Sequence, residues 1–473
     1  MLEPVSITPM LISAALKVWS EQAASAASRQ LANQLTSRLG HRPASGAGLE
    51  SALRRELERE PTFGVDLREW LLRSGAIDPL TASDFASSRI WIKEGVGGLI
   101  EETLEAHKEF RESDDVPLLT RPGWIPASPL PLHPERVTLR RMVGLSDSLE
   151  PARHRLRELG YWPVVGGSRI PTYHDAIHLL DKPPIWHNGT SYRLMDVDPK
   201  ADTVRLIFND EPGHYFDMMD TGEPLAFEAA WQARSSLPAA GPYRSWLADP
   251  FNFAIRCAVP GVNVLTVRRS KSSTLFYLHE RVRVGLSAGT NHIVPAGEFQ
   301  PASDWPRALE NDFDLFHVIT REYAEEFCGI GEAREQEASP IDYRNDQRYA
   351  PIYRALTEGR VLVRYLGIGL YPLTWKPEIL IVCVFDDATF DRLFRDLKSV
   401  DIEARNTEGG EGQLHRPPTP PGSRLKNRRD KEYGGWDFGE ETVRYWRDKP
   451  TTLPAGRACL GLAWRHRMEL GLG

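Results

Sequence analysis

The sequence predicts an α+β protein in which an N-terminal helical module precedes a domain with a mixed β-sheet. Two observations lead to this fold class. In the first third of the chain, leucines recur four positions apart, which places them on one face of a helix. From about Tyr192 onward, short runs of β-branched and aromatic residues alternate with helical segments. Strands interrupted by helices are typical of a domain that packs helices on a sheet.

Length and composition limit the classes of protein that this chain can belong to. Its 473 residues are enough for two or three domains, because one domain takes roughly 150 residues. Hydrophobic residues make up 41% and charged residues 26%, as in ordinary globular proteins. The net charge of -7 provides no overall positive field, so we do not expect nucleic acid or anionic lipid as a partner.

Cysteine usage and hydropathy predict a cytoplasmic protein. The four cysteines lie far apart and form no CxxC pair, which suits a reducing compartment better than a disulfide framework or a zinc ribbon. No run of apolar residues approaches the ~18 that a membrane span needs. The N-terminus lacks the basic segment that opens a secretory signal, so we expect neither a signal nor a membrane span.

Residues 1–115 are predicted to form the helical module. Thr8 followed by Pro9 is typical of a helix start, because proline in the first turn gives up only an amide that would lack a partner there. The leucine stripes predict the core of the module itself, and a protein partner for the module is a further expectation. The predicted helices contain Leu31, Leu35 and Leu39 before Gly40, then Leu49, Leu53 and Leu57, then residues 67–71 and 100–110.

Prolines recur from Pro117 to Pro134, which disfavours a helix, and the segment lacks strand alternation. We therefore expect an extended linker over 116–134, followed by a second domain over 135–473. That domain should begin with a helix near 149–159 and contain strands and helices in mixed order. The expected strands are 203–208, 263–267, 274–278, 361–370 and 378–385, with helices over 313–327 and 388–397 and a flexible Pro- and Gly-rich loop over 406–435.

The most informative segment is Arg321-Glu322-Tyr323-Ala324-Glu325-Glu326. On a helix, Glu322, Glu325 and Glu326 occupy positions i, i+3 and i+4, so their three carboxylates share one face. Like charges packed together repel each other, and a hard divalent cation such as Mg²⁺ relieves that repulsion through oxygen ligands. The alternative is a solvated acidic surface with salt bridges to basic neighbours.

This segment resembles the second half of the Nudix box, G-x5-E-x7-R-E-U-x-E-E-x-G-U with U apolar, and Pro295-Ala296-Gly297 resembles its opening. The resemblance covers about 249–397 and implies a Nudix-like α/β/α sandwich. It also implies a hydrolase that cleaves the diphosphate of a nucleoside diphosphate derivative with Mg²⁺ or Mn²⁺. By this resemblance Glu322, Glu325 and Glu326 are metal ligands and catalytic residues, and Arg321 orients the acidic cluster.

Three departures from the family pattern leave the activity open, and one of them is an additional residue, Cys328, between the glutamate pair and Gly329. Arg321 lies 24 positions after Gly297, where the family has 14, so the loop carries ten additional residues. Phe313 stands where the first glutamate of the box belongs. Asp312 and Asp314 flank that position and, with Glu298, are second candidates for a base or an additional ligand. The alternative function is therefore a catalytically inactive, nucleotide-sensing domain that regulates through the helical module.

A narrower resemblance extends to the C-terminus. The runs 295–301, 310–315 and 458–467 are similar to the C-terminal module of actinobacterial proteins often labelled helix-turn-helix regulators. No helix-turn-helix pattern precedes the module here, so DNA binding is not implied. The layout suggests a portable sensor or enzyme module, and a role in stress or phage defence through the N-terminal helices is a third alternative.

One other motif places two histidines four positions apart. His174-Asp175-Ala176-Ile177-His178 is similar to the zincin pattern H-E-x-x-H, with aspartate in place of glutamate. A metalloprotease needs the longer glutamate as its base and a third metal ligand. We therefore favour histidines that pack within the fold over a zinc site.

Overall fold

The computed structural model describes residues 7–20, 26–59, 63, 67, 70–71, 82–113, 115–144, 148–165, 168–183, 186–234, 241–281, 290–331, 340–394 and 435–473. The chain divides into two compact units, each made of three chain segments. Unit 1 comprises Met1–Ala106, Leu149–Lys182 and Met219–Asp249, and unit 2 comprises His107–Ser148, Pro183–Met218 and Pro250–Gly473.

Unit 1 is helical. Leu31, Leu35, Leu49 and Leu53 are all buried in one cluster, as their spacing predicts. Gly40 ends the second helix in the left-handed conformation that glycine adopts without strain. The elements are α1 (Ile7–Ser20), α2 (Ala26–Leu39), α3 (Gly46–Arg59), α5 (Ala82–Ala106), α6 (Glu150–Leu159), α7 (Tyr173–Leu180), α9 (Glu223–Arg234) and α10 (Pro242–Leu247), with a hairpin of β3 (Val164–Val165) and β4 (Ser168–Arg169). Helix α8 (Tyr215–Thr221) begins in unit 2 and ends in unit 1.

Unit 2 is built on a seven-stranded mixed sheet. The strand order is β1-β14-β15-β9-β10-β16, and β13 also pairs with β9. Strands β15 and β9 are parallel, and the other pairs are antiparallel. The strands are β1 (Leu130–Pro131), β9 (Gly261–Arg269), β10 (Thr274–Phe276), β13 (Ala296–Glu298), β14 (Val361–Leu370), β15 (Pro377–Asp386) and β16 (Trp436–Asp437). Strands β9, β10, β14 and β15 correspond to the strands predicted over 263–267, 274–278, 361–370 and 378–385.

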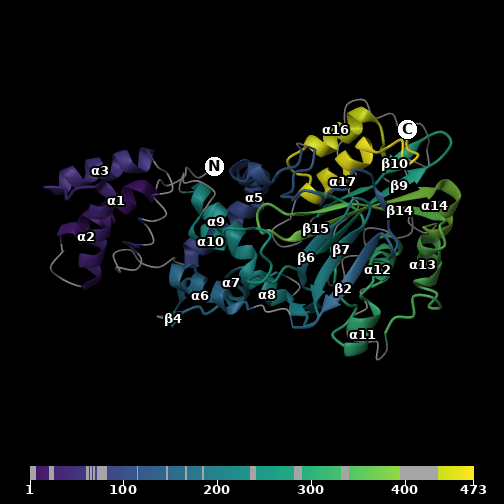
Figure 1. Ribbon diagram of the computed structural model, residues 1–473, viewed down its shortest axis with the longest axis horizontal. Coiled ribbons are helices and arrows are strands. Elements are labelled where there is room, and N and C mark those ends of the chain that lie inside the picture. The colour runs from purple at the N-terminus through teal and green to yellow at the C-terminus, as the bar shows by residue number, and fades with distance from the viewer. Residues whose placement is uncertain are drawn as a thin grey trace. The chain divides into compact units, whose positions relative to one another are not determined.

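Helices cover both faces of this sheet (Figure 1). On one face, Leu265 of β9 and Val382 of β15 pack with Cys459 of α17 (Pro454–Arg465) in one apolar cluster. On the other face, the hydroxyl of Thr266 lies 2.7 Å from that of Tyr323 in α12 (Leu315–Cys328). Successive residues of a strand point to opposite faces of the sheet. Helices lie on both faces, so neighbouring residues of β9 are buried on both sides of the sheet.

Smaller elements complete unit 2. A second sheet contains β2 (Val137–Met142), β7 (Val204–Asn209) and β6 (Leu194–Pro199), with β2 parallel and β6 antiparallel to β7. The two-stranded pairs are β5 (Thr190–Ser191) with β8 (Gly213–His214), and β11 (Leu278–Arg281) with β12 (Thr290–Ile293). The remaining helices are η1 (Lys108–Phe110), α11 (Pro306–Asn311), α13 (Ala350–Thr357), α14 (Asp387–Leu393) and α16 (Glu440–Asp448). Together, the helices and mixed sheets confirm the predicted α+β class.

The domain boundaries differ from those expected. Residues 116–134, expected to be a linker, belong to unit 2, where Val116 and Leu118 are buried and β1 pairs with β14. Segments 149–182 and 219–249 belong to the helical unit, which we expected to end at residue 115. The loop expected over 406–435 lies, except for Gly435, outside the described residues. Within the described part, no helix is long and apolar enough to cross a membrane.

Candidate functional site

The two halves of the Nudix-like pattern lie side by side. The backbone N–H of Ala296 in β13 donates a 2.8 Å hydrogen bond to Oε1 of Glu326 in α12. Gly297 lies so close to Glu322 that a methyl group on Gly297 would overlap the Glu322 carboxylate. The longer loop between the two halves contains α11 and does not separate them. Two of the three predicted metal-ligand carboxylates, those of Glu322 and Glu326, therefore lie next to strand β13.

Glu326 is held by two donors. Its Oε1 accepts the Ala296 N–H, and its Oε2 lies 3.0 Å from Nδ1 of His279 in β11. The His279 side chain is 3% exposed and that of Glu326 is 11% exposed. Each oxygen of this carboxylate thus has a protein partner in place of a ligand. These contacts fasten α12 to both β13 and β11.

The other two glutamates have different surroundings. Glu322 is buried against Gly297, whereas Glu325 is partly exposed and its Oε1 lies 3.9 Å from Nε of Arg321. The three carboxylates share one helix face, as predicted, but they do not converge on a common point. In the part of the chain that the structure describes, no three His, Cys, Asp or Glu side chains are arranged to hold a metal ion.

Arg321 lies at the centre of a buried polar network. Its Nη2 donates to the carbonyl of Gln300 at 2.8 Å, and its Nη1 lies 3.4 Å from the Tyr343 hydroxyl and 3.7 Å from Oδ2 of Asp312. Burial alone would lower the pKa of Arg321, but Tyr343 and the carboxylates of Glu322, Glu325 and Asp312 outweigh it and raise the pKa. The guanidinium is therefore charged at any working pH, and it stabilises the acidic helix from within.

The second candidates also have structural partners. Asp312 is 0% exposed and accepts hydrogen bonds from Ala302 N–H and the Asn311 side chain, at 2.7 and 2.8 Å. Asp314 caps the N-terminus of α12 through Phe316 N–H. Capping by aspartate is common because its carboxylate satisfies an amide that the helix leaves free. The third candidate is Glu298, which forms a 2.8 Å ion pair with Lys376.

Phe313, at the position of the first box glutamate, belongs to an aromatic cluster. Its ring centroid lies 5.1 Å from that of Tyr192 and 5.2 Å from that of Phe208. The guanidinium of Arg141 in β2 lies over the Phe313 ring, 4.5 Å from its centroid. A cation over an aromatic face is attracted by the negative potential of that face. The Phe313 ring therefore stabilises the charge of Arg141.

Three residues near the acidic helix were missed by the sequence analysis: His279, Arg141 and Glu378. The side chain of Asn263 in β9 links Glu378 at 2.7 Å to His292 at 2.8 Å, and His292 is paired across the strands with His279. Their proximity depends on strand register between distant segments. No spacing in the sequence carries that information.

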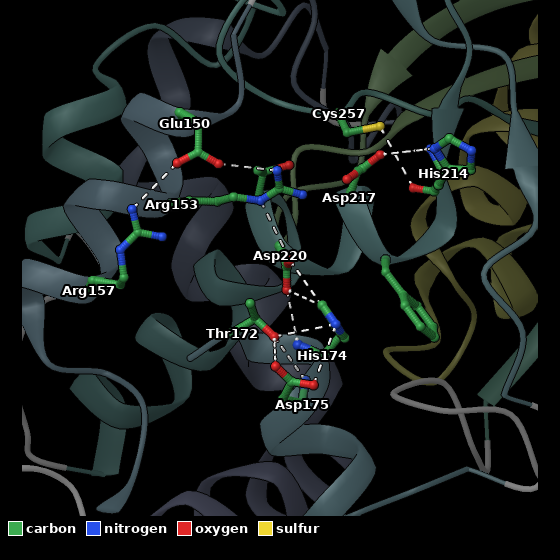
Figure 2. Close-up of polar contacts among 12 residues, drawn as sticks. Glu150, Arg153, Arg157, Thr172, His174, Asp175, His214, Asp217, Asp220 and Cys257 are labelled. Atoms are coloured by element: carbon green, nitrogen blue, oxygen red, sulfur yellow. Dashed lines mark hydrogen bonds and ion pairs between the residues drawn. The ribbon is translucent and has the colours of Figure 1, made fainter. Parts of the chain in front are cut away.

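The histidine motif lies on α7 in unit 1, where Asp220 is its principal partner (Figure 2). His174 Nδ1 lies 3.0 Å from both carboxylate oxygens of the buried Asp220, and the backbone N–H of His174 donates to Oδ1 at 3.0 Å. Arg153 approaches the same carboxylate at 3.6 Å. His178, the second histidine of the motif, is exposed. These contacts favour a structural ion pair over the zincin-like arrangement.

The His174–Asp220 pair should make stability depend on pH. Burial disfavours charged His174, but the hydrogen bond and charge of Asp220, with Asp175, outweigh burial and the charge of Arg153, so the pKa of His174 is raised. A raised folded-state pKa stabilises the fold fully below the unfolded value of about 6.5, and the gain is lost as pH rises through the folded pKa. We expect the stability difference between wild type and His174→Asn to be largest near pH 5 and to shrink toward pH 8 in urea unfolding. A difference that is constant across this range would contradict this expectation.

The chain matches no protein-family model, no curated protein and no solved structure.

Proposed function

We propose that unit 2 is a Nudix-like domain that binds a nucleoside diphosphate derivative without hydrolysing it. The observation that carries the proposal is the use made of Glu326, whose two carboxylate oxygens are engaged by Ala296 N–H and His279. A metal ligand needs its lone pairs directed at the ion, together with other ligands around it. The acidic helix, as arranged here, does not fit a divalent ion.

The proposed ligand class comes from the Nudix resemblance. The proposal is supported by the contact between the P-A-G segment and the acidic helix, and by helices on both faces of the sheet. Fixed hydrogen bonds at Glu326 and Arg321 would give a rigid frame for a ligand, which limits the entropy lost on binding. In this proposal the ligand-bound state is signalled through the helical unit, as a sensor domain requires.

A second function, diphosphate hydrolysis, is favoured by one observation. Glu322 and Glu326 both reach β13, so two of the predicted ligands already lie next to one strand. Bound Mg²⁺ or Mn²⁺ would polarise the diphosphate and activate water. This function would require Glu326 to leave His279 and turn toward Glu325.

The two functions are separated by a turnover assay. The panel contains nucleotide sugars, NAD, ADP-ribose, dinucleoside polyphosphates and nucleoside triphosphates, each with Mg²⁺ or Mn²⁺. We expect no release of phosphate or nucleotide from any of them, together with thermal stabilisation of the protein by at least one. Release that disappears in the Glu325→Gln/Glu326→Gln variant would establish the hydrolase instead. If no member of the panel is hydrolysed and none stabilises the protein, both functions are contradicted.

A further inference from the structure

Binding a diphosphate without a metal ion requires protein cations near its oxygens, because two linked phosphates carry at least two negative charges. We infer that Arg141 is the diphosphate-binding residue of unit 2, with its guanidinium taking the electrostatic role that a metal has in a hydrolase. This inference deepens the proposed function and depends on it. Nothing in the sequence pattern identifies Arg141, because it lies in β2, outside the Nudix-like segment.

Arg141 lies against two aromatic side chains of unit 2. Its guanidinium lies over the ring of Phe313, 4.5 Å from the centroid, and 5.6 Å from the centroid of Tyr192. Phe313 occupies the place that the Nudix box gives to its first glutamate. The site has therefore replaced a carboxylate, which would repel phosphate, by an aromatic ring that supports a cation. The two ring contacts also restrict the position of the guanidinium before any ligand binds.

The partners of Arg141 can be exchanged for a phosphate. Its Nη1 donates to Oε1 of Glu310 at 2.6 Å, and its Nη2 donates to the carbonyl of Leu309. The Glu310 side chain is 76% exposed, and ion pairs of that kind contribute little to stability. A phosphate offers the same planar fork two acceptors and more charge. Glu310 can thus swing into solvent when a ligand binds.

The other cations of this region are less suited to the role. Arg321 is buried and is held by Gln300, Tyr343 and Asp312. Its release would leave the buried Asp312 without a cation. Lys376 has a single positive point charge, which Glu298 neutralises at 2.8 Å. Arg141 combines a guanidinium held over two rings with an ion-pair partner at the surface.

The test compares two neighbouring arginines of the same strand. Arg140 is exposed and, as the adjacent residue of β2, points to the opposite side, so Arg140→Gln removes the same charge without touching Phe313. Affinity is measured by calorimetry in EDTA for ADP-ribose, UDP-glucose, NAD and inorganic pyrophosphate. Arg141→Gln should weaken binding about tenfold or more, as expected for a lost charge-assisted contact. Arg140→Gln should change affinity by less than about twofold.

A second variant protects the test against a folding defect in Arg141→Gln. Glu310→Gln alters an exposed side chain and removes the competing charge, so it should raise affinity several-fold. If wild type and both arginine variants bind equally well, and Glu310→Gln has no effect, the role of Arg141 is overturned. That outcome does not contradict the proposed function. Wild type that binds none of the four probes would overturn the inference about Arg141, and wild type that also binds no other member of the panel would overturn the proposed function. Binding that appears only with Mg²⁺ would also overturn the inference, because a metal would then carry the charge.

Discussion

Replacing Arg321 by methionine should lower the free energy of unfolding by about 3–5 kcal/mol, the range seen when one partner of a buried ion pair is removed. Methionine keeps much of the side-chain volume of arginine. The loss of unfolding free energy therefore measures the hydrogen bonds and ion pairs of Arg321 and not its packing. Asp312 would remain completely buried with Ala302 N–H and Asn311 but without a cation. Urea unfolding of the full chain measures the change.

A double variant separates the network from packing. Arg321→Met/Asp312→Asn should cost clearly less than the two single substitutions added together, because the neutral amide no longer needs a cation. If the changes in unfolding free energy of the two single variants simply add in the double variant, the network does not hold α12 in place. A loss below about 1 kcal/mol for Arg321→Met would lead to the same conclusion.

A methyl group at Gly297 should destabilise the protein by about 1–3 kcal/mol, the usual cost of overpacking a close contact. The added carbon would overlap the carboxylate of Glu322, which is itself buried. Either β13 or Glu322 must then move, and both lie at the candidate site. Thermal unfolding of Gly297→Ala gives the magnitude.

The control for this prediction is Gly331→Ala, because a methyl group at Gly331 has no described atom within 4 Å. It should leave stability within about 0.5 kcal/mol of wild type. The cost of Gly297→Ala should also largely disappear when Glu322 is already alanine. If the cost persists in the Glu322→Ala background, the close approach of Gly297 and Glu322 is not its cause.

The helices and strands around the site follow from local sequence, whereas the interactions of the site residues do not. The acidic helix was predicted over 313–327 and spans Leu315–Cys328, because its periodicity, its Asp314 cap and its Gly329 end are all local signals. The shared face of Glu322, Glu325 and Glu326 follows from the same periodicity. That Glu326 would be held by His279 depends on β11 crossing near α12, and no local pattern encodes that crossing.

The two compact units differ from the expected domains for a related reason. Proline excludes a helix over 116–134, but it does not exclude an irregular segment that packs against a sheet, as Val116 and Leu118 do. Unit 1 gathers three separate chain segments. Segments 149–182 and 219–249 pack on α5 through contacts between residues far apart in the sequence, such as the ion pairs of Arg89 with Asp181 and Glu223. No local sequence pattern encodes such contacts.

Metal-independent ligand binding by unit 2 is tested most directly by one measurement. The affinity of wild type for ADP-ribose, UDP-glucose, NAD and inorganic pyrophosphate is measured by calorimetry in EDTA and again with Mg²⁺, beside Glu326→Gln and the exposed-site control Glu358→Gln. We predict that at least one of these probes binds, that its affinity agrees within about threefold in the two buffers, and that both variants keep it. Binding that requires Mg²⁺ and is lost in Glu326→Gln but not in Glu358→Gln would contradict the account, because Glu326 would then be a metal ligand.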